Sequence, residues 1–401
     1  MMEAYIIDGI RTPIGSYQGG LSSVRVDDLA AHVIKQISTR NSQIPPDAYD
    51  DVLMGCANQA GEDNRNIARM ALLLAGLPYS VPGETINRLC ASGLASVVNA
   101  SHAIKAGAGH LYIAGGAENM TRGPYVVSKP STAFGTDSKM YDSSFGWRFI
   151  NPRMHELYGT DAMGETAENL VDVHGISRDD QDAFALWSQQ KAAKAQANGF
   201  FAEEIAAVSV AQRKGDPLIF LNDEFIKPNT TLEGLAKLKP AFRKNGTVTA
   251  GNASGLNDGA AAVIVASEQA VKQYQLEPMV RIVSSATAGV EPRIMGIGPV
   301  EASYKALNKA GLSLDDMDVI ELNEAFAAQA LACTRSWGLN DTDARINPNG
   351  GSIALGHPLG VSGTRIAWAA ARELKRSGKR YALVTMCIGV GQGYAAVLER
   401  V

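Results

Sequence analysis

Short apolar runs typical of strands alternate along the chain with amphipathic or small-residue runs typical of helices. In the first third, strands are expected at residues 4–7, 50–55 and 110–114, and helices at 27–40, 65–75 and 92–107. Strands and helices that alternate at this spacing predict βαβ units and a largely parallel sheet. The same character returns at residue 247, where we expect a small-residue helix over 258–262 and a strand over 263–266.

The last third of the chain repeats the order of the first. The matching segments are 279–283 with 4–7, 300–310 with 29–40, 315–322 with 47–54, and 381–386 with 110–114. A long internal duplication of this kind predicts an α/β fold in which two similar halves lie side by side. We expect one half at residues 1–120 with 251–277 and the other at 278–401. The more polar region 121–250 is expected to be an insertion that covers a site where strand ends of both halves meet.

Composition narrows the class of protein. The chain has 401 residues, of which 46% are hydrophobic and 19% charged, which fits a compact globular protein. A net charge of −4 gives no reason to expect a nucleic acid or a membrane surface as partner. No apolar run reaches the ~18 residues of a spanning helix, and the first residues show no leader pattern. The four cysteines form no CxxC pair, so we expect no metal site, a reducing compartment and a cytoplasmic location.

Cys90 is the first candidate for chemistry because of its place in the pattern. It follows a short extended run at 84–86 and precedes the helix expected at 92–107. At a helix N-terminus, unpaired N–H groups and the helix dipole favour a thiolate, which predicts a pKa below that of free cysteine. A buried structural cysteine is the ordinary alternative.

Three further stretches place polar groups at expected strand ends or helix starts. They are Asn323-Glu324-Ala325-Phe326, Gly356-His357-Pro358-Leu359-Gly360-Val361-Ser362-Gly363 and Met386-Cys387-Ile388-Gly389-Val390-Gly391-Gln392-Gly393. Taken singly, each has an ordinary explanation: Asn323 can cap a helix, and His357 can be a satisfied core histidine. Glu118 and Asn119, after the strand at 110–114, are interpreted as turn residues.

Considered together, these residues suit covalent catalysis. Cys90 needs a nearby base, which His357 can supply, and Cys387 can carry a proton if its pKa is lowered. The backbone N–H groups of Cys90 and Gly389 can face a developing oxyanion. The stretches that begin at Cys90, Asn323, Gly356 and Cys387 resemble the motifs of the thiolase family, in the same order and at similar separations, over essentially the whole chain.

The resemblance implies a thiolase fold with α/β/α/β/α layers and an inserted loop domain, assembled as a homotetramer. It implies that Cys90 carries an acyl group, that His357 activates it, and that Cys387 is the acid/base. Asn323, through a water, and His357 would bind the thioester oxygen of the enolate, and Cys90 and Gly389 N–H groups the second oxyanion. The implied reaction is thiolytic, reverse-Claisen cleavage of a 3-oxoacyl-CoA, with CoA as co-substrate and no permanently bound cofactor.

CoA carries phosphates, and the segment 213–244 holds seven Lys and Arg residues against four Asp and Glu residues. An ordinary solvated surface is the alternative explanation. The resemblance assigns CoA contacts to Lys227 at the nucleotide end, to Ser254 near the pantetheine, and to Met163. Many family members have His-Met where this chain has Ala162-Met163, which predicts a pocket shaped for something other than an acetoacetyl group.

Segments 55–66 and 146–152 resemble the family's subgroup that cleaves 3-oxoadipyl-CoA to succinyl-CoA and acetyl-CoA in aromatic-compound breakdown. That acyl chain ends in a carboxylate, which is costly to bury unpaired and is bound well by a guanidinium. The candidate partners are Arg148 and Arg153, followed by Arg65 and Arg69. Surface ion pairing is the alternative role for each of them.

Three other functions compete with this one. A general acetyl-CoA C-acetyltransferase, acting on acetoacetyl-CoA, is the nearest alternative. A ketoacyl synthase-type condensing enzyme pairs its cysteine with two histidines or with His and Asn, so a second cysteine at Cys387 favours a thiolase. A non-catalytic CoA-binding scaffold would have no use for two cysteines and a histidine in glycine-rich turns.

Overall fold

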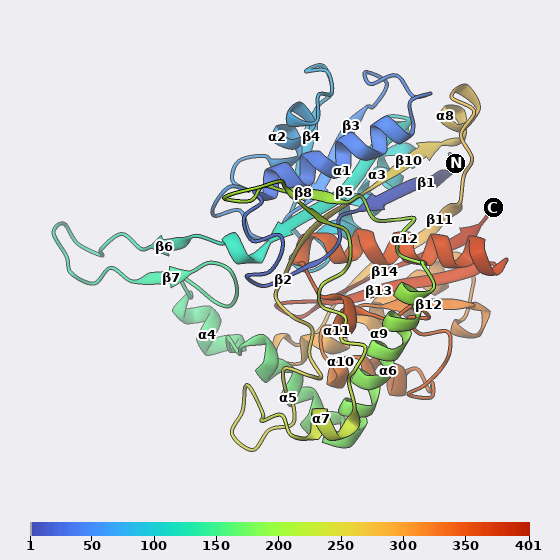
Figure 1. Ribbon diagram of the computed structural model, residues 1–401. Helices are drawn as coiled ribbons and strands as arrows, with labels where there is room; N and C mark the ends of the chain where they lie inside the picture. Colours follow the sequence, from blue (N-terminus) through green and yellow to red (C-terminus); the bar gives the residue numbers. More distant parts are fainter. Residues whose placement is uncertain (1) are drawn as a thin grey trace.

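The computed structural model describes residues 2–401, which form a ten-stranded mixed sheet with helices around it (Figure 1). The strand order is β12-β13-β14-β11-β1-β10-β5-β3-β4, with β2 paired to β10. From the β11–β1 junction outward, β11-β14-β13-β12 matches β1-β10-β5-β3, so the predicted duplication into two halves is confirmed, and β4 and β2 are additions to the first half. The strands of the first half are β1 (Ala4–Arg11), β2 (Gly15–Ser16), β3 (Asp51–Gly55), β4 (Gly83–Ile86), β5 (Leu111–Asn119) and β10 (Asn257–Ser267). Those of the second are β11 (Val280–Gly289), β12 (Val319–Leu322), β13 (Tyr381–Ile388) and β14 (Gln392–Arg400).

Helices form three layers around the two halves of the sheet. The middle layer consists of α3 (Ser92–Lys105) and α12 (Leu359–Ser377), which contact each other and strands of both halves. The outer layers consist of α1 (Val26–Arg40) and α2 (Ile67–Leu74) on one side, and of α9 (Gly298–Ala310) and α10 (Ala327–Ser336) on the other. The expected α/β/α/β/α arrangement is therefore present. The shorter helices of this framework are η1 (Met120–Arg122), α8 (Glu268–Gln273), η2 (Pro292–Ile297), η3 (Leu314–Asp316) and α11 (Ser352–Leu355).

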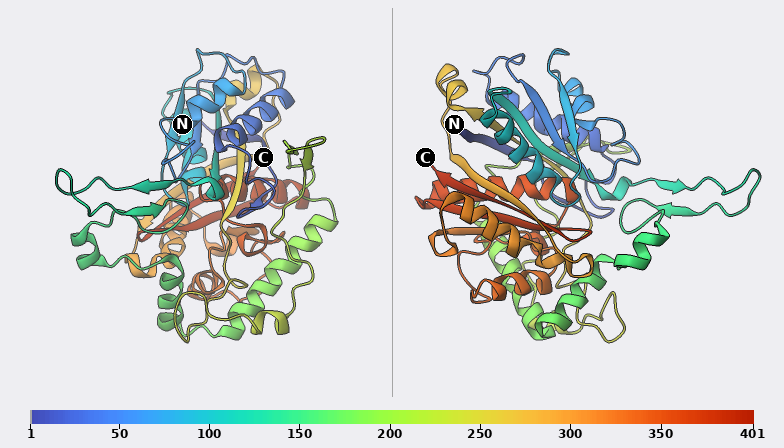
Figure 2. Two further views of the ribbon diagram at one scale, coloured as in Figure 1. Left: turned by 60° about the vertical axis from the view of Figure 1, so that its left-hand side comes forward. Right: turned by 180° about the vertical axis from the view of Figure 1, so that it is seen from behind.

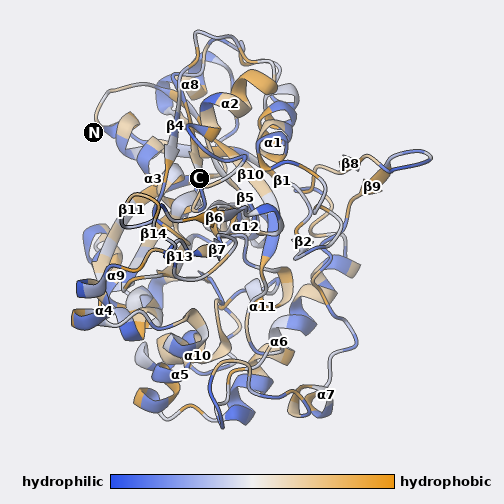
Figure 3. Cartoon of the chain, turned by 90° about the vertical axis from the view of Figure 1, so that its left-hand side faces the viewer, coloured by the Kyte–Doolittle hydropathy of each residue, from blue (hydrophilic) through white to orange (hydrophobic). Residues whose placement is uncertain are grey.

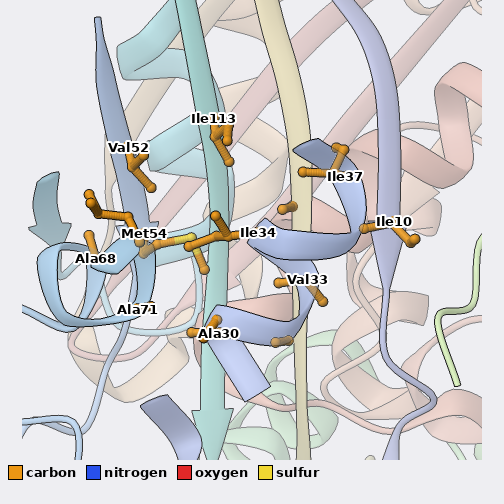
Figure 4. Close-up of a cluster of buried hydrophobic side chains, with 14 of the residues drawn as sticks. Ile10, Ala30, Val33, Ile34, Ile37, Val52, Met54, Ala68, Ala71 and Ile113 are labelled. Carbon is orange, nitrogen blue, oxygen red and sulfur yellow. The ribbon is translucent and has the colours of Figure 1, made fainter. Parts of the chain in front are cut away.

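Each of the three helical layers packs on the sheet through its own hydrophobic core. In the first, Ala30, Val33, Ile34 and Ile37 of α1 pack on Met54 and other strand residues (Figure 4). The second core lies between α3 and α12, and the third under α9 and α10. Apolar positions three and four apart on α1 give it this buried face. No helix within residues 2–401 is long and apolar enough to cross a membrane.

The prediction of a largely parallel sheet is wrong. Parallel pairing is confined to β3 with β4 and β5, and to β12 with β13. The central strands pair antiparallel because each half adds a return strand, β10 after the insertion and β14 after a short turn, that runs back along the strand before it in the sheet. The β13–β14 return takes only the three residues 389–391, which is a hairpin and not a crossover.

The helix predicted over 258–262 is also wrong, because these residues belong to β10. Alanine favours helices, but propensity is a weak prior that tertiary context overrides. Ala261 pairs with Arg11 on one side and with Gly116 on the other, in the middle of the sheet. Small side chains suit this strand because α1, α3 and α12 all contact it.

The region between β5 and β10 departs from the core and returns to it, as expected for an insertion. Both views in Figure 2 show the β6–β7 arm extending away from the rest of the protein. The longest helix of this region is α6, which begins with a capping box at Ser177. The elements are β6 (Tyr125–Val127), β7 (Met140–Asp142), α4 (Pro152–Tyr158), α5 (Met163–His174), α6 (Arg178–Ala197), β8 (Val208–Val210), β9 (Leu218–Phe220) and α7 (Leu232–Ala236).

Candidate active site

Cys90 lies in the turn between β4 and α3, as the sequence predicts. The residue before it, Leu89, has a φ of 47°, a left-handed conformation that is uncommon for a leucine. Two hydrogen bonds hold this turn. The Leu89 N–H donates to Asn87 Oδ1 at 2.9 Å, and the Ser92 hydroxyl donates to the Leu89 carbonyl at 2.6 Å. Strain of this kind persists where the surroundings determine the conformation, and it is frequent at active sites.

Burial dominates the ionisation of the Cys90 thiol. The backbone N–H groups of Gly389 and of Cys90 itself contact the thiol and lower its pKa, but desolvation raises the pKa to about 11. The predicted thiolate is therefore wrong for the resting site, because desolvation outweighs these dipoles. Cys90 is a neutral thiol that has to give its proton to a base.

His357 is held by hydrogen bonds on its backbone and its ring. Its N–H donates to Asn257 Oδ1 at 2.9 Å, and its Nδ1 lies 2.6 Å from Ser362 Oγ. Because the Ser362 hydroxyl donates to the Pro358 carbonyl at 3.1 Å, Nδ1 carries the proton and Nε2 is the unprotonated nitrogen. Burial first, and then the charge of Arg365, lower the pKa of His357 to about 3. The imidazole is therefore neutral and can accept a proton at Nε2.

Asn323 turns its amide toward the same nitrogen. Its Nδ2 lies 3.4 Å from His357 Nε2, and its Oδ1 accepts a hydrogen bond from the Ser352 hydroxyl at 2.6 Å. The hydroxyl thus fixes which end of the amide faces the imidazole. Neither Asn323 nor Glu324 caps the helix that follows, since α10 begins later, at Ala327, with no side-chain cap.

Cys387 lies near the end of β13 and is 1% exposed. Desolvation, followed by the neighbouring thiols of Cys90 and Cys333, raises the pKa of Cys387 well above its ordinary value. Cys387 is therefore protonated in the resting site and is placed to donate a proton. All four cysteines are free thiols.

Two cavities meet at Cys90. The first, which we call the catalytic cavity, measures about 230 Å³ and is lined by Cys90, His357 and Cys387. Its remaining lining is largely apolar and includes Met163 and Phe326. The structure thus brings the predicted nucleophile, base and second thiol together from three separate parts of the duplicated framework. The second cavity measures about 210 Å³ and shares Cys90 and Met163 with the first.

Of the two arginine candidates, only Arg148 lines the second cavity. Arg148 is half-buried and lines it, together with Asn58 and Trp147. Arg153 is exposed on α4 and is not among the described residues that line either cavity. Arg69 is occupied elsewhere, donating to the carbonyls of Val81 and Tyr79.

The cations of segment 213–244 do not gather at one place. Arg213 and Lys214 lie on the hydrophilic tip between β8 and β9 (Figure 3), and Arg243 pairs with Glu165 and Asp172. Lys227 lines a cavity of about 320 Å³ beside α7. Ser254 lines the catalytic cavity, and its hydroxyl donates to the Ala325 carbonyl at 3.0 Å.

Sequence reasoning missed several residues that shape this site. Ser362 orients His357, and Ser352 orients Asn323. Ser362 lies inside the glycine-rich stretch that singled out His357, so a hydroxyl partner for the ring was open to prediction. Glu118 was assigned to a turn, but it lies in β5 and is 1% exposed. The sequence does carry a signal for a buried Glu118, because an acidic residue directly continues a run of buried strand residues. Asn119 does act as expected and caps η1.

Two family models match the chain almost end to end. The N-terminal domain of thiolase matches residues 4–269, and the C-terminal domain matches residues 276–400. The 3-oxoadipyl-CoA/3-oxo-5,6-dehydrosuberyl-CoA thiolase of Escherichia coli K12 is 60% identical, and the beta-ketoadipyl-CoA thiolase of Acinetobacter baylyi 58%, each over the full length of both chains. The crystal structure of human mitochondrial 3-ketoacyl-CoA thiolase superimposes with a TM-score of 0.92 at 43% identity, covering 100% of this chain and 99% of that one. The two family models, the full-length relatives and the fold together show that this chain belongs to the thiolase family and is an acyltransferase.

Proposed function

We propose that this enzyme uses CoA to cleave 3-oxoadipyl-CoA into succinyl-CoA and acetyl-CoA. The observation that carries the proposal is Arg148 in the lining of the second cavity, which Cys90 also lines. An acyl chain attached to Cys90 can extend into this cavity and set its terminal carboxylate against the guanidinium. Relatives named for this substrate, 58–60% identical over their full length, support the same reading.

The first half of the proposed reaction uses Cys90 and His357. His357 Nε2 takes the thiol proton as Cys90 attacks the keto carbon, because neither group ionises on its own at neutral pH. The N–H groups of Cys90 and Gly389 already point at the sulfur and can receive the oxyanion that forms beside it. The carbon–carbon bond then breaks and leaves an acetyl-CoA enolate.

The second half uses Cys387 and Asn323. Cys387 protonates the enolate carbon, which suits a thiol whose raised pKa keeps its proton at neutral pH. The amide of Asn323, through a water, and His357 bind the enolate oxygen. After acetyl-CoA leaves, CoA gives its thiol proton to Cys387 and its sulfur takes the acyl group from Cys90. The Cys90 sulfur that is released takes back the proton held on His357 Nε2, which restores all three residues. CoA acts as a co-substrate throughout.

We propose that CoA runs from the catalytic cavity to the cavity beside α7. Ser254 and Met163 lie at the inner end of this route and Lys227 at the outer end. Nearby acids are engaged elsewhere: Asp223 pairs with Arg11, and Glu224 accepts N–H groups of Ser16 and Gly20. Among the described residues no carboxylate pairs with Lys227, so its charge is available to an anionic nucleotide.

A general acetyl-CoA C-acetyltransferase is the second candidate, favoured by the apolar side chains that line most of the second cavity. Comparing kcat/KM for 3-oxoadipyl-CoA and acetoacetyl-CoA separates the two. We expect preference for the dicarboxylic substrate, and equal efficiency on both would contradict the substrate proposal while leaving the family unchanged. The assay is loss of the 3-oxoacyl-CoA enolate absorbance with CoA as acceptor.

We further propose a cytoplasmic homotetramer. The β6–β7 arm exposes Tyr125, Val127, Phe134 and Met140, which are 61–102% accessible in the isolated chain. Large apolar side chains on a projecting arm favour burial against another copy. The four free thiols agree with a reducing compartment. Light scattering coupled to size-exclusion chromatography tests the assembly: four copies are expected, and loss of the tetramer is expected in a variant with Phe134 and Met140 changed to Ser.

A further inference from the structure

A single buried carboxylate lies behind the nucleophile and is bonded to backbone on both sides of it. Glu118 Oε2 accepts hydrogen bonds from the N–H groups of Ala57 at 3.0 Å and Gly360 at 2.9 Å. Its Oε1 accepts one from the Asn58 N–H at 2.9 Å. No part of the proposed reaction uses Glu118 directly.

We infer that Glu118 is a positioning residue that joins the loop after β3 to the start of α12. By this link it fixes the positions of Cys90, His357 and the wall of the second cavity relative to one another. This inference rests on the roles proposed above for Cys90 and His357.

On one side, Glu118 supports the strained turn that carries Cys90. The Ala57 carbonyl accepts a hydrogen bond from Asn87 Nδ2 at 3.1 Å, and Asn87 Oδ1 accepts the Leu89 N–H. The side chain of Asn87 therefore links the loop fixed by Glu118 directly to Leu89, the residue before Cys90. Asn58 extends the same loop to the second cavity, because its Nδ2 donates to the Ser143 carbonyl at 3.1 Å.

On the other side, Glu118 fixes Gly360 in the first turn of α12, three residues after His357. The backbones approach so closely here that a side chain would not fit. A Cβ on Gly360 would lie 2.7 Å from the Ala117 carbonyl oxygen, and a Cβ on Gly116 would lie 1.8 Å from the Gly360 oxygen. The carboxylate thus sets the contact between a strand of the first half and a helix of the second.

The ionised form of Glu118 is the one that can make all three contacts. A protonated carboxyl would turn its O–H toward an N–H donor and lose at least one of them. Burial raises the pKa of Glu118 to about 7 against the effect of its three N–H donors, and Asp63 adds to the rise. The titratable groups that face it are Cys56 and Asp63 on the loop after β3, and Cys90.

Cys56, Asp63 and Glu118 place ligand atoms within 4.8 Å of one another, which also raises the question of a metal ion. The hydrogen bonds argue against one. Three N–H groups already use the Glu118 oxygens, the Cys56 thiol donates to the Asn58 carbonyl at 2.9 Å, and Asp63 accepts the Gly61 N–H at 2.8 Å. A metal would have to break the contacts that hold the loop.

The test compares pH profiles of kcat for thiolysis in the wild type, Glu118→Gln and Glu118→Asp. In the wild type, kcat should fall as the pH drops through about 7, because protonation of Glu118 weakens its hydrogen bonds to the loop after β3 and to the start of α12. Glu118→Gln cannot ionise, so its kcat should be at least ~10-fold lower at pH 8 and should show no step near 7, with the KM for CoA little changed. Glu118→Asp keeps an ionisable group and should retain a step at reduced kcat.

Asp50→Asn is the matched control. Asp50 lies at the other end of β5, where its carboxylate accepts the N–H groups of His110 and Leu111 at 2.7 and 2.9 Å. This variant should keep the wild-type profile. A step that persists in Glu118→Gln would overturn the inference, as would a wild-type rate that rises below pH 7. The latter would mean that the charge of Glu118, which raises the pKa of Cys90, matters more than its contacts.

If Glu118→Gln fails to fold, the wild type still decides the matter. The carboxyl stretch of Glu118, followed by infrared spectroscopy with isotope-labelled glutamate, should titrate at the pH where kcat falls. Titration at another pH would overturn the inference. Failure of the proposed catalytic roles would instead appear as residual acyl transfer in Cys90→Ala, which is independent of these outcomes.

Discussion

Replacing Arg148 by Met tests whether a distal carboxylate decides the substrate. Arg148 is half-buried in the lining of the second cavity, and among residues 2–401 its side chain makes one hydrogen bond, to Asn58 Oδ1 at the long distance of 3.4 Å. Its charge is thus largely free to meet an anionic group. Methionine keeps an apolar stem of about the same length as the aliphatic part of arginine and removes the guanidinium.

The size of the effect follows from the kind of contact. A hydrogen bond to a charged group contributes about 1.5–3 kcal/mol, and a bidentate pair lies toward the upper end. Since about 1.4 kcal/mol is tenfold in kcat/KM, Arg148→Met should lower kcat/KM for 3-oxoadipyl-CoA by about 10- to 150-fold. The value for acetoacetyl-CoA should change little, because that acyl group carries no charge.

Arg153→Met is the control for general effects of removing a nearby cation. Arg153 is exposed on α4, so its loss should leave both substrates within about twofold of the wild type. An equal loss on both substrates in Arg148→Met would show that the residue supports the fold of the cavity. No loss on either substrate would show that the carboxylate is bound elsewhere, and both results would refute the reasoning.

Three other predictions concern the catalytic cavity. Cys90→Ala should abolish the covalent acyl-enzyme, which mass spectrometry after incubation with acyl-CoA checks. Cys387→Ala should leave Cys90 able to accept an acyl group, while exchange of the acetyl-CoA α-proton in deuterated water falls at least ~10²-fold; exchange at the wild-type rate would exclude Cys387 as the acid/base. His357 has a folded pKa of about 3 against 6.5 unfolded, so its contribution to stability is present above pH 6.5 and is lost as the pH falls toward 3. Urea denaturation of His357→Asn should show weaker acid destabilisation in that window, and an unchanged slope would contradict the pKa shift.

The order of elements could be predicted from the sequence because it depends on local periodicity. The match of β11, α9, β12 and β13 to the first half follows from repeated spacing alone. The directions of pairing could not be predicted in the same way. Whether β10 runs parallel or antiparallel to β5 depends on the path of residues 120–256, which lie between the two strands, and no local signal records that path.

The same distinction between local and long-range information applies to the site. Cys90, His357, Asn323 and Cys387 could be located because each lies near the end of a strand or the start of a helix, where side chains of α/β folds form sites. Their ionisation could not be predicted, since the helix N-terminus is visible in the sequence and the burial that opposes it is not. Glu118 shows the limit most clearly: its bond to Gly360 spans 242 positions.

The resting state of the site suits the reaction better than a preformed thiolate would. With the pKa of Cys90 at about 11 and that of His357 at about 3, the neutral pair is the stable one. The two N–H groups that face the sulfur therefore stabilise little charge before substrate binds. When the thiol attacks and its proton moves to Nε2, negative charge appears on the substrate oxygen beside the same N–H groups. Interactions that strengthen only as charge develops lower the barrier without deepening the ground state. In the proposed mechanism, burial keeps the Cys90 thiol neutral before substrate binds. The N–H groups of Cys90 and Gly389 therefore stabilise negative charge mainly in the transition state, which contributes to catalysis.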